Sequence, residues 1–600
     1  MADPKTPPPE EEYQISDPAE FGRNMVRVAM QSQKALAEYM EGQQKNDGGA
    51  SDPLNVGTAF NELLNHMASD PSKLMEAQFE LWKAQANLWQ TSWRRFMGEE
   101  VEPVVTPARG DKRFRHEDWA ENAVFDFIKQ SYLLTADWLH DTVADVEGLD
   151  DETRRKVDFY TKQFSDAISP TNFALTNPAV LRATMSSNGE NLVKGLDNLL
   201  HDLEQGDGNL NITQTDMSMF EVGKNIAVSK GKVIYRNDML ELLQFDPLTE
   251  EVYEKPLLIF PPWINKYYIL DLRQDNSFIK WATEHGHTVF VASWVNPDEQ
   301  HANKEFKDYM FDGVLKSLDA IEQATGAREV NAIGYCIGGT MLSATLAYMA
   351  ATGDKRITSA TFFAAQADFS EAGDLQIFVD DHQLEALEQQ MIASGGYLKG
   401  SEMANTFNML RANDLIWNYV INNYMLGKDP FPFDLLYWNA DATRMPYKTH
   451  MFYLRNFYRD NELSRGVMEI EGQQLDLGKV KIPIFLQSSQ TDHIAPYNSI
   501  YKSTKLFGGK VKFIMAGSGH IAGVVNHPAA KKYQYWTNTH QPDEVQDWVV
   551  GATAHAGSWW PEWHRWLSRK SGKKVPARVP GDGKLKPIMD APGSYVLVKS

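Results

Sequence analysis

Cysteine is almost absent from this chain: Cys336 is the only one among 600 residues. A single cysteine cannot close an intramolecular disulfide, so the sequence excludes a disulfide-stapled secreted scaffold and a cysteine-based zinc cluster. We expect no metal and no cofactor. The one thiol that is present therefore needs an explanation of its own.

Positively charged residues are also fewer than negatively charged ones. Lys and Arg total 59 against 80 for Asp and Glu, a net charge of −21, which argues against broad nucleic-acid binding because that depends on basic surface. The opening residues, "MADPKTPPPEEEYQ", lack the basic and apolar regions of a signal peptide. An uncharged window over 331–353 is interrupted by "GYCIGG", which favours a strand, a turn and a helix over a transmembrane segment. We expect a cytoplasmic protein without a transmembrane segment.

The first third of the chain is predicted to be helical. Residues 1–20 begin with a Pro- and Glu-rich stretch and are predicted to be disordered, whereas 21–205 show helical patterns and no strand pattern, which indicates an all-helical N-terminal domain. A helix expected over 73–97 has apolar residues spaced alternately by four and three. Such stripes usually pack inside their own protein, so we expect this one to contact other helices. Its members are Met75, Phe79, Trp82, Ala86, Trp89, Trp93 and Phe96.

The remainder, 206–600, alternates short apolar strands with helical segments. Continuous apolar strands of this kind indicate a parallel sheet covered on both faces, and thus an α/β fold. The fourth and fifth strands are separated by far more residues than a crossover needs, so 367–480 is predicted to form an inserted cap. The six expected strands are 255–260, 287–294, 330–336, 359–366, 481–489 and 510–517.

Cys336 has the surroundings of a catalytic nucleophile. It is the centre of "GYCIG", a glycine–x–nucleophile–x–glycine sequence, with a strand before it and a helix-prone segment after it. This is the context of a nucleophile elbow, the sharp strand-to-helix turn of α/β-hydrolases. The first amides of the following helix favour a thiolate electrostatically. A buried structural cysteine is the alternative reading.

Partners for this thiol follow in the order that α/β-hydrolases use, nucleophile, acid and histidine. Asp492 comes after the fifth strand and His520 lies on a glycine-flanked loop after the sixth, so we assign both to a catalytic triad with Cys336. His493, next to Asp492, is expected to be a substrate contact or a structural residue. The oxyanion hole is predicted to use the amides of Ile337 and Trp263, because Pro261 and Pro262 have no N–H.

A cysteine nucleophile also indicates the type of reaction. A thiol exchanges acyl groups with thioesters at little free-energy cost, because the bond broken and the bond made are alike, whereas a serine would form an oxygen ester. The cysteine therefore points towards acyl transfer from a thioester.

Five motifs resemble those of the polyhydroxyalkanoate synthases, specifically the class I, single-subunit enzymes. They are "GYCIGGT", "PPWINKYYILDL", "TDHIAP", "SGHIAG" and "GSWWPEW", and the resemblance covers about residues 100–600. It implies an α/β-hydrolase fold with a large cap insertion. It also implies that Cys336 carries the growing chain, that His520 is the base, and that Asp492 helps to activate the 3-hydroxyl of the acyl group.

The resemblance implies roles for further residues. Arg411, in "MLRANDLIWNYVINNYMLG", would face the coenzyme A entrance, where a guanidinium suits phosphate; a surface salt bridge is the alternative. Asp271 is expected to anchor the cap. Trp559, Trp560 and Trp563 are expected to pack a terminal helix.

The function implied is polymerisation of (R)-3-hydroxyacyl-CoA, with 3-hydroxybutyryl-CoA as the expected substrate, into polyester with release of coenzyme A. The alternatives are a cysteine-triad thioesterase or hydrolase, and a non-catalytic granule-associated protein. We expect a homodimer at the surface of cytoplasmic polyester granules, with granule-associated proteins as possible partners. If the stripe on 73–97 is not buried, it is a candidate to bind the polymer, a granule protein or a second subunit.

Overall fold

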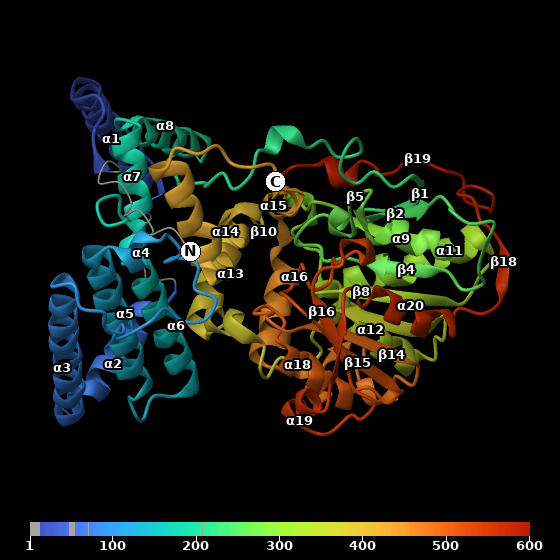
Figure 1. Ribbon diagram of the computed structural model, residues 1–600. Helices are drawn as coiled ribbons and strands as arrows, with labels where there is room; N and C mark the ends of the chain where they lie inside the picture. Colours follow the sequence, from blue (N-terminus) through green and yellow to red (C-terminus); the bar gives the residue numbers. More distant parts are fainter. Residues whose placement is uncertain (1–12, 47–53, 70, 207) are drawn as a thin grey trace, which may run out of the picture. The chain divides into compact units, whose positions relative to one another are not determined.

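The computed structural model describes residues 13–46, 54–69, 71–206 and 208–600 (Figure 1). The chain divides into two compact units. We call the first the helical unit; it comprises the chain up to Asp216 together with Phe407–Phe431. The second, the sheet unit, comprises Met217–Thr406 and Pro432–Ser600. Within the described residues, no helix combines the length and apolar character needed to cross a bilayer.

The sheet unit is built on one mixed sheet whose strand order is β17-β16-β15-β14-β9-β8-β4-β7-β2-β1-β19. The six predicted strands are its parallel centre, and antiparallel pairs extend it at both edges. The central strands are β4 (Leu257–Phe260), β7 (Val289–Trp294), β8 (Val330–Tyr335), β9 (Ile357–Phe363), β14 (Ile484–Ser489) and β15 (Val511–Ala516). The edge strands are β1 (Gly231–Arg236), β2 (Leu240–Phe245), β16 (Gln534–Thr537), β17 (Thr553–Ala556) and β19 (Met589–Asp590).

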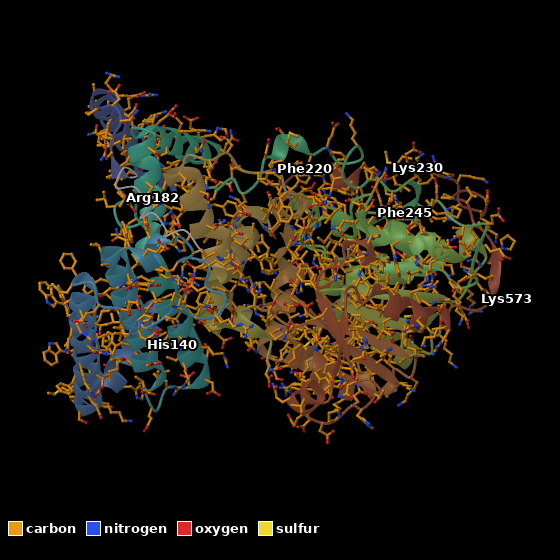
Figure 2. All side chains as sticks on the ribbon, in the orientation of Figure 1. His140, Arg182, Phe220, Lys230, Phe245 and Lys573 are labelled. Carbon is orange, nitrogen blue, oxygen red and sulfur yellow. The ribbon has the colours of Figure 1, made fainter. Side chains whose placement is uncertain are left out.

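Both faces of the sheet are covered, as the apolar strands predict. Every residue of β4 is buried, with Leu258 and Phe260 in one core and Leu257 and Ile259 in the other. β2 is buried along its whole length, up to Phe245, which Figure 2 labels. The first core includes side chains of α11 (Lys316–Thr325), α12 (Ile337–Thr352) and α18 (Tyr497–Lys502), and the second those of α9 (Phe278–Glu284) and α20 (Trp560–Ser568).

The described part of the helical unit contains no strand. Of the segment 1–20, residues 1–12 lie outside the described residues, and the first helix begins at Pro18. Buried ion pairs contribute to this unit; Asp126, for example, contacts Arg95 at 2.6 Å and Lys129 at 2.8 Å. The helices are α1 (Pro18–Asn46), α2 (Val56–Ser69), α3 (Pro71–Phe96), α4 (Asp118–Glu121), α5 (Ala123–Ala144), α6 (Asp151–Ala167), α7 (Pro178–Ser186) and α8 (Glu190–Gln205).

The apolar stripe on α3 is exposed rather than buried against other helices as expected, although the ring of Trp89 does contact α5, with its centroid 4.9 Å from that of Phe127. All seven of its residues are exposed, and Trp82, Trp89 and Trp93 are each between 64% and 67% exposed. A shorter stripe on another face of α3, ending in the fully buried Leu88, faces α5 instead. The indole of Trp138 on α5 also donates to the Ala77 carbonyl of α3 at 3.0 Å. In Figure 2, rings stand out along the free side of α3.

The long segment between β9 and β14 contributes to both units. It holds α13 (Asp381–Ala393), α14 (Gly400–Leu410), α15 (Asp434–Ala440), α16 (Tyr447–Phe452) and α17 (Glu462–Arg465). Its middle part, 407–431, packs on α8 of the helical unit: the Asn191 side chain donates to the Met425 carbonyl at 2.7 Å. Gly195 permits this contact, because a Cβ there would lie 1.9 Å from the Tyr424 carbonyl oxygen.

Gly195→Ala should loosen the 407–431 segment. The added methyl group cannot fit against a backbone carbonyl, and such overpacking costs about 1–3 kcal/mol. We expect faster tryptic cleavage after Lys428 than in the unchanged protein. Gly22→Ala on α1 is the matched control, because no atom lies within 4 Å of a Cβ there. Equal cleavage rates in the two variants would contradict the packing described.

Candidate active site

The backbone of Cys336 is held in a conformation that few residues other than glycine adopt. Its φ is 52° and its ψ is −127°, between the last residue of β8 and the first of α12. Such backbone strain costs roughly 1–3 kcal/mol and persists only where the surroundings fix it. Here the Cys336 amide donates to the Phe363 carbonyl at 2.9 Å, and its carbonyl accepts from Gly339 at 2.8 Å. This is the backbone geometry of a nucleophile elbow.

Three glycines allow this turn to pack. A Cβ on Gly334 would lie 2.4 Å from the Gly339 Cα, and one on Gly338 would lie 2.4 Å from the carbonyl oxygen of Phe260. A Cβ on Gly339 would meet the Cβ of Ala365 at 2.4 Å. The glycines therefore do more than reduce steric crowding within the turn. They also allow the elbow to pack closely against the backbone at the end of β4 and against Ala365 after β9.

Asp492 and His520 come together at the carboxyl ends of β14 and β15. The Nδ1 atom of His520 lies 2.7 Å from Oδ2 of Asp492. The other carboxylate oxygen, Oδ1, accepts from the amides of Ile494 and Ala495 at 2.9 Å each. Both side chains are at least nine-tenths buried. Asp492 is thus fixed as an acceptor towards His520.

The His520 side chain also hydrogen-bonds the Cys336 side chain. Because Nδ1 is engaged by Asp492, this contact falls to Nε2. Burial opposes the charged imidazolium, but the charges and hydrogen bonds of Asp492 and Cys336 outweigh it and hold the pKa of His520 well above its ordinary value.

The loop that carries His520 is fixed from two sides. Beneath it, the Tyr335 hydroxyl donates to the His520 carbonyl at 3.2 Å. Beyond it, the indoles of Trp559 and Trp560 donate to the carbonyls of Gly523 and Val524 at 2.7 and 2.9 Å. These tryptophans and Trp563 are fully buried, as the sequence predicts for a terminal helix. Packing of α20 therefore positions the histidine as well as closing the core.

The two predicted oxyanion donors lie at the start of the helix after β8 and on the loop after β4, as expected. Ile337 is the first residue of α12, so its amide is among those that the helix leaves without an intrahelical acceptor. Trp263 follows β4, and its buried ring stacks on Tyr309 at 4.3 Å between centroids. The Thr443 hydroxyl donates to the Trp263 carbonyl, which fixes the peptide plane of the loop.

Two tyrosines that sequence reasoning missed lie close enough to Cys336 for its charge to act on their hydroxyls. Tyr453 and Tyr458 begin and nearly end a π-helical stretch, Tyr453–Arg459, and both are buried. Burial raises the pKa of each phenol, and the nearby Cys336 raises both further. No spacing rule could have found them; the only sequence signal is the aromatic density of "HMFYLRNFYR".

Two other residues singled out by the sequence have local partners of their own. Arg411 belongs to the helical unit, where its half-exposed side chain pairs with Asp414 at 2.9 Å. Asp271 is fully buried, and its carboxylate accepts from the hydroxyls of Ser229 and Ser277 at 2.6 Å each. It therefore anchors the segment before β1 to the start of α9, and the expected anchoring of the cap is not what its contacts show.

Comparison with known proteins identifies the family. Residues 110–282 match the family described as poly-beta-hydroxybutyrate polymerase (PhaC) N-terminus, and residues 257–526 match the alpha/beta hydrolase fold. The chain is 50% identical over its whole length to the poly(3-hydroxyalkanoate) polymerase subunit PhaC of Rhizobium meliloti, covering 98% of that protein. It is 51% identical to the poly(3-hydroxyalkanoate) polymerase of Methylorubrum extorquens, over 92% of this chain and 91% of that one.

A third relative, the poly(3-hydroxyalkanoate) polymerase subunit PhaC of Cupriavidus necator, is 40% identical over 88% of this chain and 89% of its own. The matches extend across both units, and they agree with the resemblance that the five motifs carry. With this identity over nearly the full length of several relatives, the chain belongs to the poly(3-hydroxyalkanoate) polymerase family.

Proposed function

We propose that Cys336 carries the growing polyester as a thioester, with His520 as the base and Asp492 as the residue that orients it. Family membership makes the protein a poly(3-hydroxyalkanoate) polymerase, an enzyme of the acyltransferase class. The observation that supports our assignment is the contact of His520 with both Asp492 and Cys336 at a nucleophile elbow.

The first step is acylation of the enzyme. The Cys336 thiolate attacks the thioester carbonyl of an (R)-3-hydroxyacyl-CoA, and the amides of Ile337 and Trp263 hold the oxyanion that forms. When the tetrahedral intermediate collapses, its bond to coenzyme A breaks. The coenzyme A thiolate leaves with the proton of the His520 imidazolium, and the acyl group remains on Cys336.

The second step lengthens the chain. The 3-hydroxyl of another 3-hydroxyacyl-CoA attacks the thioester on Cys336, and His520 takes the hydroxyl proton as the new ester forms. The Cys336 thiolate is released, and the chain, longer by one unit, is now attached to coenzyme A. Acylation of Cys336 by this chain then repeats the first step and releases coenzyme A.

Product analysis tests this function. With 3-hydroxybutyryl-CoA, the protein should release coenzyme A and form insoluble polyester, whereas Cys336→Ala should do neither because it lacks the sulfur that forms the thioester. Cys336→Ser keeps the geometry with a weaker nucleophile and should retain a trace of activity. Soluble 3-hydroxybutyrate as the main product would instead show a thioesterase, and wild-type release of coenzyme A by Cys336→Ala would overturn the assignment.

Titration of the His520 imidazole tests its contact with Asp492. Asp492 helps to hold the pKa of His520 above its ordinary value. Asp492→Asn should therefore lower the pKa of His520, and the midpoint of its imidazole titration, followed by NMR, should move to lower pH. His493→Ala is the neighbouring control and should leave this midpoint in place; equal midpoints in the unchanged protein and in Asp492→Asn would contradict the contact.

We further propose that the protein works in the cytoplasm at the surface of its polyester product, held there by the exposed face of α3. That face is an uncharged row of aromatic and Met side chains, Met75 to Phe96, each at least 60% exposed apart from Ala86. An aliphatic polyester presents an apolar, uncharged surface, which suits such a face. The same face could instead bind a second subunit in a homodimer or a granule-associated protein. The experiment must distinguish these two alternatives from binding to the polyester.

A variant with Trp82, Trp89 and Trp93 changed to Gln should lose retention on sedimented polyester while keeping its early rate of coenzyme A release. The control changes the exposed polar residues Lys83, Asn87 and Gln90 of the same helix to Ala. Light scattering on both variants records the oligomeric mass. A change of mass with retention intact would assign the face to a subunit contact, and unchanged retention and mass would contradict a binding role.

A further inference from the structure

The loop after β4, residues 261–266, lies directly against the nucleophile elbow. A Cβ on Gly338, two residues beyond Cys336, would lie 2.8 Å from the carbonyl oxygen of Pro261. The strands that lead into the loop and into the elbow, β4 and β8, are hydrogen-bonded neighbours in the sheet. The position of this loop therefore decides where the Trp263 amide lies relative to the sulfur.

A short segment of the inserted region, residues 438–443, pairs with this loop in antiparallel fashion and binds its carbonyls. The Thr443 hydroxyl donates to the Trp263 carbonyl, and the Thr443 amide donates to the next carbonyl along the loop at 3.0 Å. The indole of Trp438 donates to the Lys266 carbonyl at 2.7 Å. Thr443 and Trp438 are both buried, so these bonds are shielded from water.

Trp263 is held at its ring and at its carbonyl, which leaves its amide available. The ring stacks on Tyr309, and the residue as a whole is 1% exposed. Within the described residues, the Trp263 amide donates to no acceptor. A buried N–H without an acceptor costs free energy, so this amide is suited to a negative oxygen that forms only during the reaction. Because the carbonyl and the amide share one Cα, a donor that fixes the carbonyl also limits where the amide can point.

We propose that Thr443 is a positioning residue: its hydroxyl holds Trp263 so that the Trp263 amide meets the oxyanion, and the inserted region thereby completes the oxyanion hole. This inference rests on the proposed function. Thr443 itself does not touch the reacting atoms and exchanges no proton with them. A thioester carbonyl is attacked in acylation and again in elongation, so both steps use the donor that Thr443 holds. The oxyanion hole is complete only while residues 438–443 are docked on the loop.

Thr443→Val removes the hydroxyl and keeps the shape of the side chain. We expect kcat with 3-hydroxybutyryl-CoA to fall roughly tenfold, less than the loss of a whole oxyanion donor would cost, with KM nearly unchanged because the oxyanion is absent from the bound substrate. Alkylation of Cys336 by iodoacetamide forms no oxyanion, so its rate should stay at the wild-type value. Thr443→Ser, which restores the hydroxyl, should recover most of kcat.

Thr449→Val is the matched control. It removes another buried threonine hydroxyl of the inserted region, one that donates to the Lys304 carbonyl at 2.8 Å, and it should leave both rates unchanged. Equal slowing of alkylation and polymerisation in Thr443→Val would overturn the proposal, and so would an unchanged kcat or a Thr443→Ser variant as slow as Thr443→Val. Failure of the proposed function looks different: the unsubstituted protein would then release coenzyme A without acylating Cys336.

Discussion

The contact between the buried His520 imidazole and the Cys336 thiol is the interaction on which the rest of this structure depends. It requires the sulfur to stand clear of the sheet, and the positive φ at Cys336 achieves that. The strain is tolerated because Gly334, Gly338 and Gly339 let the elbow press against neighbouring backbone. It also requires a histidine that does not move. Asp492 holds the ring, while the hydroxyl of Tyr335 and the indoles of Trp559 and Trp560 hold its loop.

Electrostatics supports the thioester exchange that we propose for this site. Asp492 and Cys336 raise the pKa of His520 above its ordinary value, which favours the positively charged imidazolium beside the sulfur. Asp492 stays an acceptor because three donors converge on it. Transfer between thioesters is nearly neutral in free energy, so the enzyme needs little more than position and charge for acylation. Elongation is more demanding, because an alcohol must be activated.

The sequence correctly predicted the features that depend on local residue patterns and on the order of motifs along the chain. The six central strands are buried on both faces and read as continuous apolar runs, and the elbow glycines stand at fixed offsets from Cys336. Strands β1, β2, β16 and β17 were missed because polar residues interrupt or flank their apolar runs, as Glu241 and Gln244 do in β2. The prediction that the α3 stripe is buried failed because seven apolar residues at helical spacing are typical of a buried helix face. The side of α3 that packs on α5 is a different one, formed by Ala77, Leu81, Ala84 and Leu88. The hydrogen bonds of Trp559 and Trp560 to the histidine loop were also out of reach, since they join side chains to backbone 36 residues away along the chain.

The central claim, a polyester chain covalently held on Cys336, can be measured directly. The protein is mixed with 3-hydroxybutyryl-CoA, quenched in acid within the first turnovers and digested, and the peptide that contains Cys336 is weighed by mass spectrometry. The account predicts a ladder of masses increased by whole numbers of 3-hydroxybutyryl units, removed by neutral hydroxylamine as a thioester should be. An unmodified Cys336 peptide in a sample that is forming polyester would contradict it.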